Sequence, residues 1–327
     1  MAILVVGSLA LDSVYTPFGE THDALGGATS FFVTAASLYD RVNLVAVVGE
    51  DFPDPYMALM RTRNVDLRGL QVVSGKTFRW GGRYALDMNS RETLYTHLGV
   101  FADFHPIVPA EFRRSEIVFL ANIQPELQLE VLQQTEEGAA REGAAPGGAT
   151  SGTKLRALDT MNLWIETARD ALTEVMRRVD VVLMAEEEVR QYTQTSNLRT
   201  AARQILALGP KLLVVKQGSY GALLLAADGS YFAAPSYPLE DVRDPTGAGD
   251  AFAGGFLGYL ASQLIVGRTL TFADYRRALI HGNIMGSFAC EDFSVNRLLQ
   301  LTPADIKARY QEFVRFTHFD GTWRDGV

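Results

Sequence analysis

A short glycine-rich segment, DPTGAGD, runs from Asp244 to Asp250 and stands directly before a run of small and apolar residues. That run predicts a buried helix, which places Gly247, Ala248 and Gly249 at the helix N-terminus. Free backbone N–H groups and the positive end of the helix dipole meet at such a terminus and bind anions. Glycine has no side chain, so it lets a phosphate group approach the backbone closely. The segment therefore predicts an anion site with the Asp250 carboxylate beside it.

An anion site next to a carboxylate suits the transfer of a phosphoryl group to an alcohol. The backbone amides would stabilise charge that develops on the transferred group, and Asp250 would accept the hydroxyl proton. The simpler alternative is a tight turn with an acidic residue near a helix start. The chain lacks the G-x-x-x-x-G-K-[ST] string of a P-loop. A dinucleotide-binding fingerprint is excluded as well, because Phe252 stands where that pattern needs its third glycine.

Length and composition favour a globular enzyme. The 327 residues, 47% of them hydrophobic, suffice for one large α/β domain. The net charge of −8, without a dense Lys/Arg block, argues against a nucleic-acid partner. Cys290 is the only cysteine, which excludes an intramolecular disulfide and favours a reducing, cytoplasmic setting. No apolar run reaches the roughly 18 residues of a transmembrane helix, so we expect no membrane partner.

Short apolar runs rich in Val, Ile and Leu alternate with amphipathic stretches of helical length. Continuous apolar strands between helices indicate a parallel sheet covered on both faces, the doubly wound α/β class. The predicted strands are 3–6, 43–48, 117–120, 155–158, 179–184 and 211–216. Examples of the predicted helices are 30–39, 125–134, 164–178 and 198–208.

Two regions break this alternation within what we expect to be a single domain over 1–327. Residues 72–98 hold short β-like runs separated by Gly and Asn-Ser signals, which predicts antiparallel strands outside the main sheet. We expect them to form a small lid, to which 11–18 add another strand. Residues 136–153 are rich in Gly, Ala and Ser without apolar periodicity, which predicts a flexible surface insertion.

The string DPTGAGDAFAGGF, which begins at Asp244, resembles the C-terminal signature of the PfkB family of carbohydrate kinases, in the ribokinase and adenosine kinase superfamily. The similarity covers nearly the whole chain apart from 136–153. It implies the ribokinase-like fold, in which helices flank a mostly parallel central sheet and a small β-stranded lid covers the sugar. It also implies that ATP, together with Mg²⁺, donates the phosphoryl group.

The resemblance gives roles to the residues that match the family's motifs. Asp250 would be the catalytic base, and the anion hole would consist of Gly247, Ala248 and Gly249. The family's K-x-G-x-x-G stretch near the nucleotide is matched by Lys216, Gly218 and Gly221, and a residue of the adenine pocket by Asn283. Positions that bind a monovalent cation such as K⁺ in some members are matched by Asp244 and Thr246.

Three features belong to the acceptor side. Asp12 ends the string GSLALD, which resembles the motif whose aspartate holds substrate hydroxyls, and a carboxylate can accept two hydrogen bonds from a vicinal diol. Gly26 and Gly27 resemble the di-glycine through which the backbone approaches the sugar. Phe31 departs from the pattern, because many members have a sugar-contacting Asn there; the change predicts an apolar pocket wall. Without the resemblance, Asp12 would be a turn or cap residue and the di-glycine a loop.

Two carboxylates are candidates for an Mg²⁺-linked role. The family's N-x-x-E motif appears here as Ala185 to Glu188, in which the Glu is kept and the Asn is lost. Glu188 would act through water, because Mg²⁺ keeps most of its hydration shell; a solvated helix start is the alternative. Asp159 follows a predicted strand, and open α/β sheets bind ligands at the carboxyl ends of their strands. The alternative for Asp159 is a helix N-cap.

Four side chains of the predicted lid are compatible with substrate contact, but we do not assign them to the site, because solvated or packing roles are the simpler interpretation. Arg79 and Arg83 would bind an anionic acceptor such as a sugar phosphate, unless they are merely solvated. Trp80 and Tyr84 would stack on a sugar or base face, unless they serve packing.

We therefore expect an ATP- and Mg²⁺-dependent kinase that phosphorylates a hydroxyl of a small polyol. Phe31 and the aromatic lid favour a non-ribose sugar, and a nucleoside is the alternative acceptor. The alternative from another class is a non-catalytic ligand-binding protein on a kinase scaffold, because the usual Asn is lost at Phe31 and Ala185. The lids of some relatives pair, which leaves a homodimer through the lid open.

Overall fold

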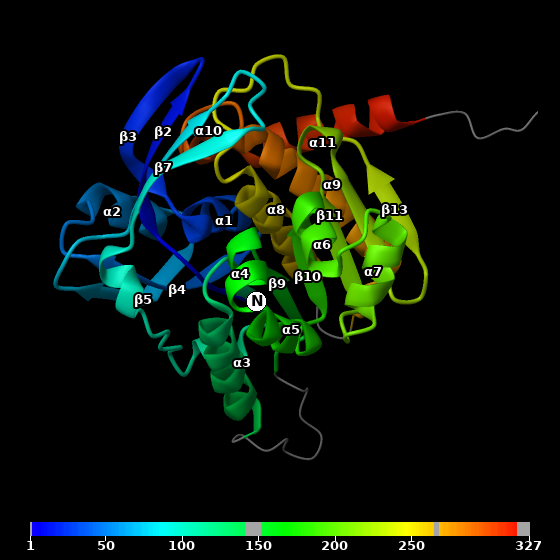
Figure 1. The fold of residues 1–327 in the computed structure, drawn as a ribbon, viewed down its shortest axis with the longest axis horizontal. Helices are drawn as coiled ribbons and strands as arrows, with labels where there is room; N and C mark the ends of the chain where they lie inside the picture. The colour runs from blue at the N-terminus through cyan, green and yellow to red at the C-terminus, as the bar shows by residue number, and fades with distance from the viewer. Residues whose placement is uncertain (1, 141–151, 265–267, 319–327) are drawn as a thin grey trace, which may run out of the picture.

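The computed structural model describes residues 2–140, 152–264 and 268–318. Within these residues the chain forms a nine-stranded sheet and a separate four-stranded sheet (Figure 1). The order of the large sheet is β13-β12-β11-β10-β9-β8-β1-β4-β5. Its strands are β1 (Ala2–Val6), β4 (Arg41–Gly49), β5 (Val65–Val73), β8 (Ile117–Leu120), β9 (Leu155–Asp159), β10 (Val181–Ala185), β11 (Leu212–Lys216), β12 (Ala222–Ala226) and β13 (Tyr231–Ala234).

The large sheet is mostly parallel. Every pairing from β11 across to β5 is parallel, whereas β12 and β13 pair antiparallel at one edge. The central strands are buried along most of their length, because helices cover both faces of the sheet. The predicted fold class is confirmed.

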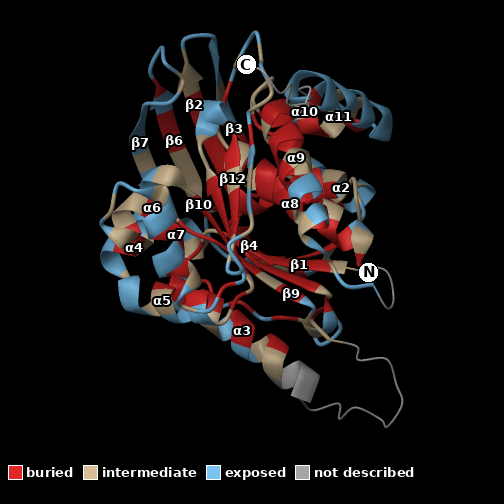
Figure 2. Cartoon of the chain, turned by 90° about the vertical axis from the view of Figure 1, so that its right-hand side faces the viewer, coloured by how far each residue is buried: buried red, intermediate tan, exposed pale blue. Residues whose placement is uncertain are grey.

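Two layers of helices enclose the sheet, and each layer shares an apolar core with one face of it (Figure 2). The first layer consists of α1 (Ala28–Ala36), α2 (Asp54–Thr62), α8 (Ala248–Gln263), α9 (Phe272–Ala289), α10 (Asn296–Gln300) and α11 (Pro303–Thr317). The second consists of α3 (Pro125–Ala140), α4 (Asn162–Thr167), α5 (Arg169–Arg177), α6 (Glu186–Thr193) and α7 (Leu198–Leu206). Within the described ranges, none of the helices combines the length and apolar character needed to cross a membrane.

The four-stranded sheet, which we call the lid, stands apart from the large sheet (upper left in Figure 1). Its order is β3-β2-β6-β7. The strands are β2 (Ala10–Thr16), β3 (Gly19–Gly26), β6 (Arg79–Tyr84) and β7 (Arg91–His97). The chain enters the lid directly after β1 and returns through Gly26 and Gly27 to α1, so the base of the lid lies at the carboxyl end of β1.

The structure corrects several predicted boundaries. Val72 and Val73 were expected in the lid, but they end β5 of the large sheet. Strand β3 of the lid was not predicted. The single helix expected over 164–178 is two helices, α4 and α5, separated at Ala168. Helix α3 runs to Ala140, so the predicted insertion over 136–153 begins in a helix; residues 141–151 of it lie outside the described residues.

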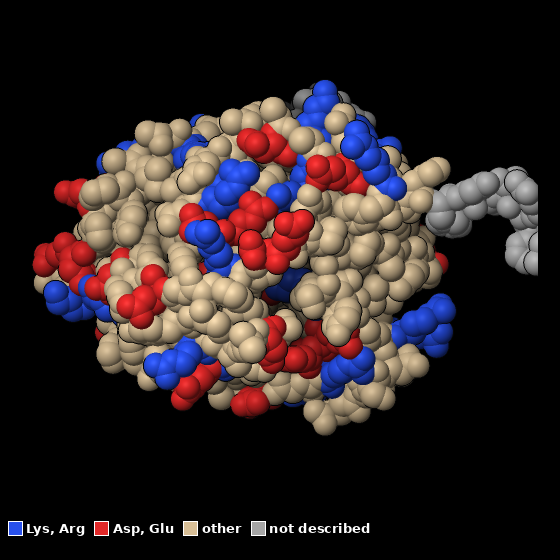
Figure 3. Space-filling view, turned by 90° about the horizontal axis from the view of Figure 1, so that it is seen from above, with Lys and Arg blue, Asp and Glu red and all other residues tan. Residues whose placement is uncertain are grey.

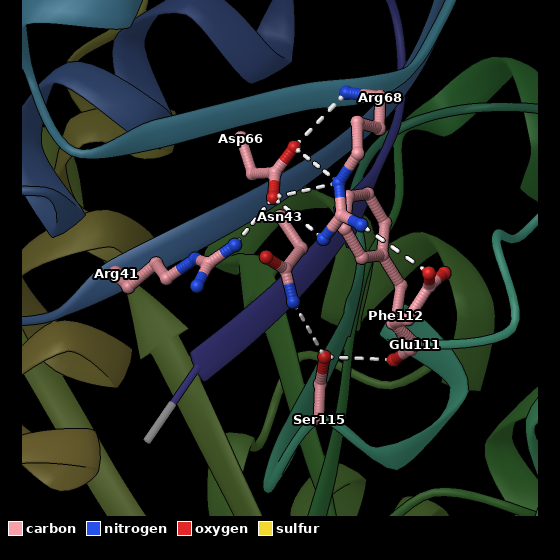
Figure 4. Close-up of polar contacts among 7 residues, drawn as sticks. All are labelled: Arg41, Asn43, Asp66, Arg68, Glu111, Phe112 and Ser115. Carbon is pink, nitrogen blue, oxygen red and sulfur yellow. Dashed lines mark hydrogen bonds and ion pairs between the residues drawn. The ribbon is translucent and has the colours of Figure 1, made fainter.

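The edge pair β4–β5 is fastened by polar side chains at its amino end (Figure 4). Asp66 of β5 accepts hydrogen bonds from both Arg41 and Arg68. Burial raises the pKa of Asp66, but these arginines outweigh it and lower the pKa to about 2. Asn43 of β4 donates from Nδ2 to the Ser115 hydroxyl over 3.0 Å. The contact between Arg41 and Asp66 joins β4 to β5 next to an irregularity in their pairing, and Asn43 joins β4 to the segment before β8.

Helices α8 and α9 pack unusually closely because glycines face the contact. A Cβ atom added to Gly255 would lie 2.4 Å from the His281 carbonyl oxygen, and one added to Gly254 2.7 Å from the Phe32 carbonyl oxygen. Backbone atoms cannot yield at such distances. The glycines thus hold α8 against both α9 and α1, and the N-terminus of α8 is fixed with them.

Candidate active site

The glycine-rich segment forms the N-terminus of α8, as predicted. Gly247 precedes the helix in a left-handed conformation, with φ of 73°, which glycine adopts at little cost. The Ala248 amide donates to the Pro245 carbonyl oxygen over 3.2 Å, so it is already used. No side chain in the described part of the chain caps this helix. The amide of Gly249 therefore remains for an anion.

Phe31 lies beneath this N-terminus and not in an open pocket wall, where we expected it. Its side chain is only 2% exposed. A Cβ atom on Gly247 would lie 2.2 Å from the Phe31 ring, so the ring packs flat against the glycine backbone. The side chain supports the anion hole from the protein interior.

Asp250 lies in the first turn of α8, where its half-buried side chain meets other carboxylates. Burial, together with the charges of Asp159 and Asp12, raises its pKa to about 8, although the charge of Lys216 lowers it. A carboxyl group with a pKa close to neutral pH is suited to exchange protons. The structure thus brings the predicted base together with the predicted acceptor and nucleotide residues.

Lys216 and Asp159 form a buried ion pair at the carboxyl ends of β11 and β9. The Lys216 Nζ atom lies 2.9 Å from Oδ1 and 2.6 Å from Oδ2 of Asp159. Burial alone would lower the pKa of Lys216, but Asp159 and Glu188 outweigh it and raise the pKa. The Nζ atom lies 3.4 Å from the point where Gly249 would carry a Cβ. A permanent positive charge therefore borders the anion hole.

Glu188 turns back onto the start of its own helix. Its carboxylate accepts a hydrogen bond of 2.7 Å from the Ala185 amide. Burial raises the pKa of Glu188 to about 7, although the Lys216 charge lowers it. The neighbouring Glu186 accepts a hydrogen bond from Gln217, next to Lys216 in the chain. At the position of the lost Asn, the Ala185 amide is thus bonded to Glu188, and Glu186 links α6 to the residue that follows β11.

The charge of this cluster fits a divalent cation. Asp159, Glu188 and Asp250 oppose the single ammonium of Lys216, and burial raises the pKa of both Glu188 and Asp250. A bound cation would favour the ionised carboxylates. Among the described residues, no three His, Cys, Asp or Glu side chains form a direct ligand cluster.

Asp244 and Thr246 hold the segment before α8 in place. Asp244 is buried and accepts hydrogen bonds from the Thr246 amide at 2.9 Å and the Ser294 amide at 3.4 Å. Burial raises the pKa of Asp244. Both residues lie beside the anion hole, but their contacts are those of a structural turn.

The predicted nucleotide residues lie on two elements. Gly218 begins the short helix η3 (Gly218–Tyr220) after β11, Gly221 follows it, and both have positive φ. Asn283 lies in α9 and is 7% exposed. Its Nδ2 atom donates to the Pro235 carbonyl oxygen over 3.0 Å. Asn283 therefore anchors the loop after β13, and its side-chain amide is directed to that loop.

Asp12 and the di-glycine meet at the base of the lid. Asp12 Oδ2 accepts a hydrogen bond of 3.3 Å from the Gly27 amide, and a Cβ atom on Gly26 would overlap the Asp12 carboxylate. Burial raises the pKa of Asp12 to about 7, whereas the Gly27 amide and the charge of Arg91 lower it. The lid guanidinium of Arg91 is therefore close enough to act on the acceptor-side carboxylate.

The lid contacts the anion-hole segment directly, which the sequence did not predict. Thr246 donates from Oγ1 to the Tyr84 hydroxyl over 3.2 Å. Tyr84 pairs with Arg91 across the β6–β7 hairpin. The alternation of side chains along β6 and β7 predicts that Tyr84 and Arg91 lie on one face of the lid. It does not predict that this face contacts the segment of Thr246. Seen from above, acidic side chains gather around a hollow near the middle of the molecular face (Figure 3).

The two lid arginines that we considered for an anionic acceptor have other partners. Arg79 donates to Asp51 at 2.9 Å and to Asp23 at 3.2 Å. Arg83 is exposed, with its guanidinium 5.7 Å from the centroid of the Tyr15 ring. Neither is directed toward Asp12.

Comparisons with known proteins match most of the chain. A family model described as pfkB family carbohydrate kinase matches residues 3–300. The chain is 30% identical to the cytidine kinase of Thermococcus kodakarensis over 259 residues, which is 78% of this chain and 87% of that protein. It is 28% identical to the 2-dehydro-3-deoxygluconokinase of Thermoproteus tenax over 285 residues, 82% of each.

The fold also matches solved structures. The ribokinase of Giardia lamblia superimposes with a TM-score of 0.77 over 95% of this chain and 98% of that one, at 16% identity. The arrangement of the large sheet and the lid is therefore shared with a known kinase structure.

Proposed function

Since the chain belongs to the PfkB family of carbohydrate kinases, we propose that it transfers the γ-phosphoryl group of ATP to a hydroxyl of a sugar or nucleoside, with Asp250 as the base. One observation carries the proposal. Asp250, with a pKa raised by burial to about 8, lies at an uncapped helix N-terminus. The Lys216 ammonium borders the same N-terminus.

The residues divide the reaction between them. Asp12 and the Gly27 backbone would hold the acceptor hydroxyls at the base of the lid. Asp250 would accept the proton of the attacking hydroxyl, which makes the oxygen a better nucleophile. The Gly249 amide and the dipole of α8 would stabilise the charge on the transferred phosphoryl group. Lys216 would add a positive charge next to the same oxygens.

Magnesium and ATP belong to this proposal. When bound, Mg²⁺ would neutralise charge on the phosphates of ATP, which supplies the phosphoryl group. Asp159 and Glu188 would hold the ion through water, and the loop that contains Gly218 and Gly221 would receive the nucleotide. We also propose a monovalent cation near Asp244 and Thr246. A comparison of turnover in potassium chloride and tetramethylammonium chloride tests it, and equal rates exclude it.

The structure removes one argument about the acceptor. We favoured a non-ribose sugar partly because Phe31 would form an apolar pocket wall, but Phe31 is buried beneath Gly247. The relatives named above include both a cytidine kinase and a 2-dehydro-3-deoxygluconokinase. The proposal therefore keeps sugars and nucleosides together as acceptors.

Replacement of the base tests the proposal. Asp250→Asn keeps the shape of the side chain but cannot accept the proton. We expect turnover to fall by at least about 1,000-fold, while calorimetry shows nearly unchanged binding of a non-hydrolysable ATP analogue. The control is Asp241→Asn, an exposed acidic residue shortly before the glycine-rich segment. Turnover in Asp250→Asn equal to that of the control would contradict the assignment.

A further inference from the structure

One lid arginine, Arg91 at the start of β7, differs from the others in its contacts. Its guanidinium lies 5.0 Å from the centroid of the Trp80 ring and interacts with the Tyr84 hydroxyl. Among the described residues, no carboxylate lies within ion-pair distance of Arg91. By contrast, Arg79 is neutralised by Asp51.

Strand pairing places Arg91 on the face of the lid that carries Asp12. Asp12 of β2 is the register partner of Trp80 in β6, and Tyr84 of β6 is the partner of Arg91 in β7. Paired residues point to the same face of a sheet, and alternate residues share a face. Since Trp80 and Tyr84 are separated by four positions, all of these side chains lie on one face.

A glycine lets the indole lie flat on this face. A Cβ atom on Gly82 would lie 2.1 Å from Cη2 of Trp80, so the ring covers the glycine backbone. The Arg91 guanidinium is then held above the ring by a cation–π contact. Because no carboxylate among the residues that the structure describes holds the Arg91 guanidinium, most of its N–H donors remain available for a ligand.

The charge of Arg91 acts within the acceptor site. It lowers the pKa of Asp12, which burial raises. An arginine fork binds two oxygens of a planar group better than any other side chain. A carboxylate on the acceptor would supply two such oxygens, and a ring carbonyl would supply one oxygen with the neighbouring ring nitrogen as the second acceptor.

We propose that Arg91 is a specificity-determining residue that binds a carboxylate or ring carbonyl of the acceptor, while Asp12 holds the acceptor's hydroxyls. The inference rests on the proposed function for the identity of the acceptor site. It separates acceptors that carry a planar oxygen-bearing group from neutral polyols that lack one. A sugar acid and a pyrimidine nucleoside both present this chemistry.

Matched pairs of compounds test the inference by binding, independently of turnover. Gluconate and glucitol differ in the carboxylate, and cytidine and ribose differ in the carbonyl-bearing base. Dissociation constants are measured by calorimetry with a non-hydrolysable ATP analogue and Mg²⁺ present. In at least one pair, we expect the compound with the planar group, gluconate or cytidine, to bind roughly 10- to 100-fold more tightly than glucitol or ribose. A difference between gluconate and glucitol would indicate a sugar acid as the acceptor, and a difference between cytidine and ribose would indicate a nucleoside.

The variants Arg91→Met and Arg91→Lys complete the test. Arg91→Met should remove the preference within the pair and leave binding of the ATP analogue unchanged. Arg91→Lys keeps the charge but loses the fork, so it should restore only part of the preference. The matched control is Arg83→Met, on the same hairpin and exposed, which should behave as wild type. Thermal melting shows whether each variant is folded.

Other outcomes overturn the inference. They are equal binding within both pairs, no detectable binding of any of the four compounds, or an equal loss in Arg91→Met and Arg83→Met. A failure of the proposed function would look different. In that case the protein would still prefer gluconate or cytidine, and this preference would depend on Arg91, but no phosphoryl transfer would be detected with ATP.

Discussion

Three carboxyl groups around the anion hole have pKa values far above their ordinary range. Burial raises the pKa of Asp250 to about 8 and those of Asp12 and Glu188 to about 7. At neutral pH the folded protein therefore holds protons that the unfolded chain has lost. The contribution of these protonated carboxyl groups to the free energy of unfolding is fully present below their pKa in the unfolded chain, near 4. It is lost as the pH rises from there through the folded pKa values of about 7 and 8.

This linkage predicts that Asp250→Asn stabilises the protein while it removes activity. At pH 8 we expect the free energy of unfolding to rise by about 1–3 kcal/mol, because the neutral amide avoids the cost of a buried charge. At pH 4 or below the gain should be small, since Asp250 is then protonated in the folded protein and largely protonated in the unfolded chain. Urea unfolding at the two pH values measures the difference. A variant less stable than wild type at pH 8 would contradict the assigned burial cost.

The ion pair between Lys216 and Asp159 allows stability and catalysis to be separated. Lys216→Met leaves a buried carboxylate unpaired, which should cost about 3–5 kcal/mol and reduce turnover strongly. The double variant Lys216→Met, Asp159→Asn removes both charges and should recover most of the stability. Its turnover should stay low, because the anion hole still lacks its cation. Recovery of turnover with stability would show that Lys216 serves the fold alone.

At this scale the sequence predicted the local geometry of the glycine-rich segment better than the long-range contacts of the lid. The segment from Asp244 to Asp250 is contiguous, so local rules for helix N-termini sufficed. The contact of Tyr84 with Thr246 joins residues far apart in the chain, and it depends on how the lid folds over the large sheet. For the same reason, Arg79 was a reasonable candidate for the acceptor, although Asp51 binds it in the structure.

Among the elements, the pair α8–α9 offers a sharp test of the packing that fixes the anion hole. In Gly255→Ala the new methyl group would meet the His281 carbonyl oxygen at 2.4 Å. We expect a loss of about 2–4 kcal/mol in the free energy of unfolding, although alanine favours helix by about 1 kcal/mol. The control is Gly286→Ala in α9, whose nearest contact is 3.1 Å. Equal stability of the two variants would contradict this account of the packing.

Strands that are continuous apolar runs could be predicted from the sequence. Strands that depend on pairing with a neighbouring strand could not. Buried strands such as β8 and β10 are continuous apolar runs, so their type followed from composition. Strand β5 ends in Val72 and Val73, whose residue types fit equally well in a lid or in a sheet edge. Strand β3 has mostly polar, exposed residues over 19–23 and owes its structure to pairing with β2. Composition cannot reveal such pairing.

For the molecule as a whole, the position of the lid depends on few polar contacts. Tyr84→Phe removes the hydroxyl that accepts from Thr246 but keeps the ring. We expect kcat/KM for the acceptor to fall roughly 3- to 10-fold and hydrogen exchange over 79–97 to accelerate. The control Tyr95→Phe changes a ring that covers Gly81 on the other face of the lid. Slower turnover without faster exchange would assign Tyr84 to substrate contact and not to lid closure.

The contact between Phe31 and Gly247 limits how this protein can acquire a new substrate. An Asn at position 31 would not recreate a sugar contact, because the buried side chain would leave a void under the glycine and an amide without partners. Phe31 and Gly247, which we call the floor of the site, are thus fixed by the same packing that shapes the N-terminus of α8. Strand β7 is largely exposed and tolerates exchange of its residues. Directed evolution toward other acceptors should therefore accumulate changes in the lid hairpin and leave the floor untouched.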